Sequence, residues 1–178
     1  GPAYGAEMRR LTGGVPQGLI ACAHGGTSMT QWDPARRREG GKSLYGAMIR
    51  RLRKNGGRVA GMIWYQGCSD ANAEAAPRYT ARMKALVAAL RRDSGDKALP
   101  VAIVQIARVV GWPEAGAAHW NSIQEQQRLL PQRIRNLATV PAIDLALDDT
   151  IHLGGEAQAV LGVRLAGAMQ ALRRSEEH

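Results

Sequence analysis

Four short apolar runs alternate with amphipathic stretches along the chain, and this alternation constrains the fold more than any other feature. Gly or Pro residues bound the runs, which span residues 17–23, 59–65, 101–107 and 138–145. Continuous apolar runs of this length are typical of strands that are covered on both faces. The sequence therefore predicts four strands in a parallel sheet.

The stretches between the runs have the periodicity of helices, with apolar side chains recurring every three or four residues. Four such stretches span residues 44–52, 79–90, 120–130 and 156–173, and residues 1–11 are expected to form a further helix. Alternating helices and strands favour an α/β fold with helices on both faces of the sheet. We therefore expect residues 1–178 to form a single domain.

Basic residues are in excess, with a formal net charge of +9. They cluster at residues 36–38, 50–54, 91–92 and 173–174. Such patches attract polyanions, but solvated helix faces and helix C-termini explain them as well. Because no aromatic platform accompanies the Arg runs, we expect no nucleic-acid partner. No apolar run approaches the ~20 residues of a membrane span, so no membrane partner is expected either. Nothing in the sequence indicates an oligomeric state.

Three polar motifs follow predicted strands, at residues 23–28, 66–70 and 148–152. Open α/β sheets bind ligands beyond the carboxyl ends of their strands, so the motifs indicate a site. Asp149 stands three residues before His152, which is close enough for its carboxylate to orient the imidazole as a general base. A capping Asp beside a surface His is the alternative. A metal site that includes Asp148 lacks further obvious ligands.

The other two motifs offer hydrogen-bond donors. The turn at Gly25 and Gly26 lets backbone N–H groups approach a ligand, although a tight strand-to-helix turn explains it equally well. The amide of Gln66 can donate to an oxyanion, or it satisfies loop backbone. Ser28 is a possible nucleophile, but it lies outside a G-x-S-x-G elbow, and a turn or cap role accounts for it.

Residues 18–28 with Gln31-Trp32, residues 61–70 and residues 149–153 resemble blocks of the sialate O-acetylesterase and acetylxylan esterase family, within the SGNH-hydrolase superfamily. The resemblance implies a flavodoxin-like three-layer αβα fold and an esterase that deacetylates carbohydrates without a metal or organic cofactor. Its residue assignments make Asp149 and His152 the acid and base of the catalytic triad. They place Gly25, Gly26 and Gln66 at the oxyanion hole.

Two departures from this resemblance matter. Cys68 stands where the family usually has Glu. The nucleophilic Ser of the family lies in a Gly-Gln-Ser-Asn block after the first strand, and that block is absent from residues 1–178. The resemblance places the missing strand between the strands that end near Cys22 and Cys68. We therefore expect an N-terminally incomplete esterase domain that is inactive alone; the alternative is a non-catalytic glycan-binding module with an esterase fold.

Overall fold

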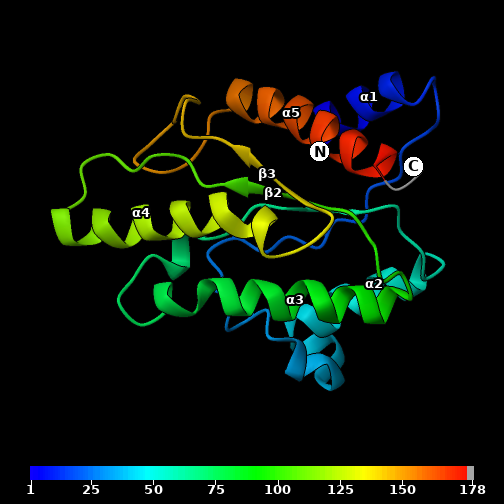
Figure 1. The fold of residues 1–178 in the computed structure, drawn as a ribbon, viewed down its shortest axis with the longest axis horizontal. Helices are drawn as coiled ribbons and strands as arrows, with labels where there is room; N and C mark the ends of the chain where they lie inside the picture. Colours follow the sequence, from blue (N-terminus) through cyan, green and yellow to red (C-terminus); the bar gives the residue numbers. More distant parts are fainter. Residues whose placement is uncertain (176–178) are drawn as a thin grey trace.

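A three-stranded parallel sheet lies between two layers of helices (Figure 1). The computed structural model describes residues 1–175. The strands are adjacent in chain order: β1 (Met62–Trp64), β2 (Val101–Gln105) and β3 (Leu137–Pro141). This architecture confirms the α/β fold class with a parallel sheet that the sequence predicts.

Central strand β2 shows why the layers form. Its alternate side chains bury on opposite faces, Val101 and Ile103 on one and Ala102 and Val104 on the other. The first face packs against α2 (Leu44–Lys54), α3 (Tyr79–Ser94) and α4 (Glu114–Leu129). The second packs against the adjacent helices α1 (Pro2–Leu11) and α5 (Gly155–Arg174). A continuous apolar run thus produces a strand with no solvent face.

The five predicted helices are present, and short 3₁₀ helices connect them. These are η1 (Pro34–Lys42), η2 (Cys68–Asp70), η3 (Ala76–Arg78) and η4 (Leu130–Gln132). Ser43 is the N-cap of helix α2, and its Oγ accepts a hydrogen bond of 3.1 Å from Gly46 N–H. A side chain that satisfies a free N–H group in the first turn fixes where a helix starts. No helix among residues 1–175 is long and apolar enough to cross a membrane.

The predicted strand at residues 17–23 is wrong. Residues 15–24 have no regular secondary structure and join no ladder, and Leu19 within them is exposed. A strand needs a neighbouring backbone to satisfy its N–H and C=O groups, and no described residue pairs with this segment. The other three strands are observed within or beside their predicted ranges, but they are shorter.

Strand β1 lies at an edge of the sheet. It pairs with β2 through a register in which Ile63 opposes Ala102, and no described residue pairs with its other side. The Ile63 side chain remains 37 % exposed, although its sequence neighbours are apolar. An apolar side chain and unpaired backbone at an edge are features that a further strand would cover.

Candidate active site

Asp149 and His152 lie on the loop that follows β3 and meet as the sequence predicts. Asp149 Oδ1 accepts hydrogen bonds of 2.8 Å from the backbone N–H groups of Ile151 and His152. Its Oδ2 lies 2.7 Å from Nδ1 of His152. The Ile151 N–H, then His152, lower the pKa of Asp149 to about 2. The carboxylate is therefore ionised at neutral pH and accepts the Nδ1 proton, which leaves Nε2 of His152 as the basic atom.

The dyad faces solvent. The His152 side chain is 73 % exposed and that of Asp149 is 53 % exposed. Among residues 1–175, no hydroxyl group is hydrogen-bonded to Nε2 of His152. The base is therefore oriented and accessible, but no nucleophile contacts it within this part of the chain.

The turn at Gly25 and Gly26 is open above its backbone. Gly26 has φ of 67°, a left-handed conformation that glycine adopts without strain, and no atom lies within 4 Å of where either Cβ would stand. Thr27 fixes the end of this turn, because its Oγ1 donates 2.8 Å to His24 C=O and accepts 2.9 Å from the indole of Trp32. A ligand can thus approach the backbone of this turn closely.

Ser28, the possible nucleophile in the sequence, belongs to the next turn. Its N–H donates 3.0 Å to Oε1 of Gln31, and its Oγ lies 3.5 Å from the same atom. These contacts agree with the turn role that the sequence left open as an alternative.

Gln66 joins the turn to the end of β1. Its Nε2 donates 2.9 Å to Thr27 C=O and 2.5 Å to Oδ2 of Asp70. Asp70 is fully buried, and the same Oδ2 accepts 2.9 Å from Met29 N–H. Both amide hydrogens of Gln66 are therefore engaged by neighbouring residues, whereas its Oε1 is buried without a partner.

Two buried residues that the sequence reasoning did not single out support this loop. Gln127 on α4 donates 2.8 Å to Gln66 C=O and accepts 2.9 Å from Ile106 N–H. Asp70 lies 3.5 Å from the guanidinium of Arg82 on α3. A signal for Gln127 was present, because it is a polar residue in the apolar stripe of α4. Asp70 had no signal beyond its place in a motif.

The structure thus forms two groups. Gly25, Gly26 and Gln66 meet through Thr27, and Asp149 meets His152. Within the described residues no hydrogen bond joins one group to the other. Gln66 follows β1, and the dyad loop follows β3, so both leave the carboxyl edge of the parallel sheet, whereas no strand among the described residues precedes the turn at Gly25 and Gly26.

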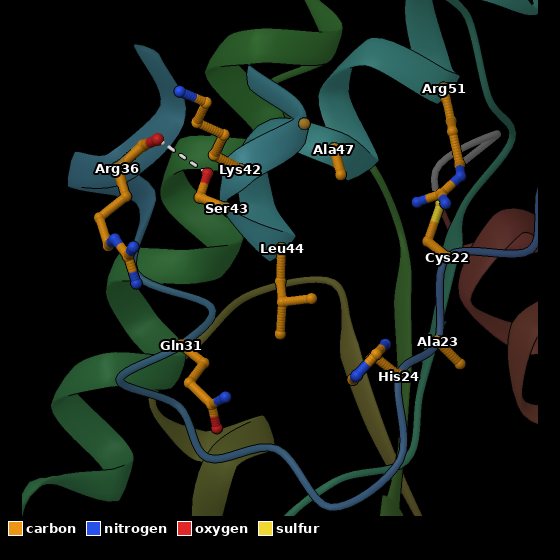
Figure 2. A pocket seen from close by; sticks show the side chains of 11 residues that line it. Cys22, Ala23, His24, Gln31, Arg36, Lys42, Ser43, Leu44, Ala47 and Arg51 are labelled. Carbon is orange, nitrogen blue, oxygen red and sulfur yellow. Dashed lines mark hydrogen bonds between the residues drawn. The ribbon is translucent and has the colours of Figure 1, made fainter. Parts of the chain in front are cut away.

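A pocket of about 390 Å³ opens beside the Ala23-His24 end of the first motif (Figure 2). His24 and Leu44 project into it, and the guanidinium of Arg51 lies beside the sulfur of Cys22. Arg36 in its wall is paired with Glu39 at 2.8 Å. None of the five predicted site residues lines this pocket. Its residues are Cys22, Ala23, His24, Gln31, Arg36, Gly41, Lys42, Ser43, Leu44, Ala47 and Arg51.

Cys22 and Cys68 are free thiols. Burial raises the pKa of Cys68 to about 11, so its thiol is neutral where the family's usual Glu would carry charge. Within residues 1–175, no three His, Cys, Asp or Glu side chains form a group that could hold a metal ion.

Comparison with known proteins relates the sequence and fold of this chain to carbohydrate esterases. Residues 1–171 match the profile of the family described as carbohydrate esterase, sialic acid-specific acetylesterase. The chain belongs to this family.

Individual relatives agree with that assignment. A protein of Arabidopsis thaliana named as a probable carbohydrate esterase is 36 % identical over 171 residues, which cover 93 % of this chain and 60 % of the relative. The crystal structure of that Arabidopsis protein superposes with a TM-score of 0.79 at 32 % identity, covering 94 % of this chain and 66 % of the other. A carbohydrate acetylesterase from Xanthomonas citri superposes with a TM-score of 0.83 at 27 % identity, covering 98 % and 40 %. The chain spans less than two thirds of each of these relatives.

Proposed function

We propose that residues 1–178 belong to a serine-type carbohydrate O-acetyl esterase, in which Asp149 and His152 are the acid and base of the triad. The observation that carries this proposal is the 2.7 Å contact between Asp149 Oδ2 and His152 Nδ1. It fixes the tautomer and aims a basic Nε2 outward, which is the geometry that serine activation requires. Membership of the carbohydrate esterase family supports an acetylated sugar as the substrate.

The dyad would work as follows. Nε2 of His152 takes the proton of a serine hydroxyl, and the serine oxygen attacks the acetyl carbonyl. Asp149 stabilises the imidazolium, which then returns the proton to the departing sugar oxygen. Water, deprotonated by the same Nε2, attacks the acetyl-serine ester. The imidazolium returns this proton to the departing serine oxygen, which releases acetate and restores the enzyme. No step in this sequence requires a metal or an organic cofactor.

The oxyanion formed in each half of the reaction needs donors. We assign it to the backbone N–H of Gly26, with Gly25 beside it, and to the amide of Gln66. To donate to the oxyanion, Gln66 must release its hydrogen bond to Thr27 C=O, because its other amide hydrogen is hydrogen-bonded to Asp70. If it does not, its role is to hold the turn at Gly25 and Gly26 in place.

The serine is assigned to a strand outside residues 1–178 that pairs with the open side of β1. The exposed Ile63 and the unpaired segment at residues 15–24 support this assignment, since one strand between them would cover both. The absence of a hydroxyl contact to Nε2 of His152 within residues 1–175 supports it as well.

The test compares dyad variants in the complete protein, including the segment that carries Gly-Gln-Ser-Asn. We expect His152→Ala and Asp149→Asn to lower kcat on 4-nitrophenyl acetate by about 10²-fold or more. Circular dichroism spectra should still show a folded domain, because both side chains are exposed. Near-normal kcat in both folded variants would overturn the assignment of Asp149 and His152 as the acid and base. No turnover by the unmodified complete protein would instead favour the glycan-binding module.

A further inference from the structure

Trp112 is exposed to solvent, whereas a tryptophan with only a structural role is usually buried. It lies on the loop between β2 and α4 with 39 % of its surface exposed, and Val110 beside it is also exposed. The other three tryptophans, Trp32, Trp64 and Trp120, are buried. Two exposed apolar side chains within three residues of one loop make this loop a candidate for a binding surface.

One side of the Trp112 indole packs against the protein. Trp112 meets buried Trp120 edge to face, with ring centroids 5.3 Å apart. A Cβ on Gly116 would lie 3.1 Å from Cε3 of Trp112, so the glycine allows helix α4 to approach the ring closely. An aromatic ring supported on one side presents its remaining surface to a ligand at small entropic cost.

The loop that carries Trp112 is joined to the loop that carries the dyad. Val110 N–H donates a hydrogen bond of 3.0 Å to Thr150 C=O. Trp112 and His152 are each two residues from that bond. The guanidinium of Arg108 adds a second tie, because it donates 2.8 Å to Leu145 C=O. Figure 1 shows the two loops leaving the carboxyl ends of β2 and β3 at the same edge of the sheet.

We infer that Trp112 is the stacking platform for the pyranose ring of the acetylated sugar, with Val110 extending the apolar surface. This inference rests on the proposed function, because it takes its ligand class from that proposal. A pyranose ring presents a face of C–H groups that packs on an indole, while its hydroxyl groups remain in solvent. Stacking beside the dyad loop would hold an acetyl ester within reach of His152.

The experiment uses iodide quenching of tryptophan fluorescence in the full chain. Because three of the four tryptophans are buried, quenching reports Trp112, and the difference from a Trp112→Phe variant isolates its signal. One arm adds partially acetylated xylotetraose, and a second adds a 9-O-acetylated methyl sialoside. We expect at least one to lower the quenching constant about twofold, because a ring over the indole covers much of its exposed surface. The sugar that lowers the quenching constant identifies the kind of sugar that Trp112 binds.

Calorimetric titration with the protecting sugar then tests the residue. Trp112→Ala should weaken binding by about tenfold, whereas Trp112→Tyr should retain most of it. The matched control is Val163→Ala, which truncates an exposed apolar side chain on a different element, helix α5. This variant should bind the sugar normally. If Trp112→Ala does not fold, protection in the unmodified chain and binding by Trp112→Tyr still decide the question.

The two proposals fail separately. No protection by either sugar, or equal affinity of a folded Trp112→Ala variant, would overturn the role of Trp112 even if the complete protein releases acetate. Protection of Trp112 by a sugar that the complete protein does not deacetylate would support the platform and overturn the esterase proposal.

Discussion

Oδ2 of Asp70 accepts two hydrogen bonds, one from Nε2 of Gln66 at 2.5 Å and one from Met29 N–H at 2.9 Å. A single buried oxygen thereby ties the loop after β1 to the segment after the Gly25-Gly26 turn. The second carboxylate oxygen faces Arg82 at 3.5 Å. The geometry of the proposed oxyanion site therefore depends on a residue that does not itself face the ligand.

Asp70→Ala should destabilise the domain strongly. It leaves the Gln66 and Met29 donors buried without an acceptor, at about 1–3 kcal/mol for each. Asp70→Asn should cost less, because its amide oxygen can occupy the place of Oδ2 while only the contact with Arg82 is lost. Urea unfolding measures both variants. Asp144→Ala, which removes an exposed partner of Arg164, is the control and should change little. Equal stability of all three variants would contradict the role of Asp70.

Asp149 should stay ionised far into the acid range. Its folded pKa of about 2 lies below the ordinary 3.8, so its contribution to stability is complete above pH 3.8 and is lost as pH falls through about 2. A ¹³C NMR titration of the carboxyl carbon measures this midpoint. His152→Ala should raise the pKa only in part, because the Ile151 and His152 backbone N–H groups remain. Asp144, whose pKa Arg164 lowers to about 2, serves as the internal reference and should not move. A return of Asp149 to 3.8 in this variant would show that the imidazole alone lowers its pKa.

Residues 1–178 alone should show no serine-type turnover of 4-nitrophenyl acetate. The base and donors are present, but donors without a nucleophile retain only about 10³–10⁴-fold over water. Ser28→Ala should leave this background unchanged, because the Ser28 backbone and Oγ both contact Gln31 in a turn. Rapid turnover that disappears in Ser28→Ala would make Ser28 the nucleophile and remove the need for an external strand.

Cys68 should react slowly with iodoacetamide. Its pKa of about 11 against an ordinary 9 lowers the thiolate fraction at pH 8 by about 100-fold. Burial also raises the pKa of Cys22, but Arg51 beside its sulfur opposes the shift (Figure 2). Mass spectrometry of Cys22→Ser and Cys68→Ser variants gives each rate separately. The burial argument fails if the thiol of Cys68 is alkylated as fast as that of Cys22.

The local parts of the site could be predicted from the sequence because they depend on short spacing. Asp149 and His152 are three residues apart, and one turn brings them together wherever the loop lies. The positions of four of the five helices followed from periodicity in the same way. Asp70 and Gln127 could not be assigned, since their partners lie 41 and 61 residues away, on Met29 and Gln66.

Residues 17–23 show where prediction from the sequence failed. Their apolar composition favours a strand, but a strand exists only where a second backbone satisfies its hydrogen bonds, and composition does not state whether that neighbour is present. The sequence by itself determined the five helices, three of the four predicted strands and the contact of Asp149 with His152, because each rests on interactions between near neighbours. Only the tertiary structure decided that Gln66 is held by Asp70, that Trp112 is the exposed tryptophan, and that β1 keeps an open side. These are properties of distant segments, and packing alone sets the distance between them.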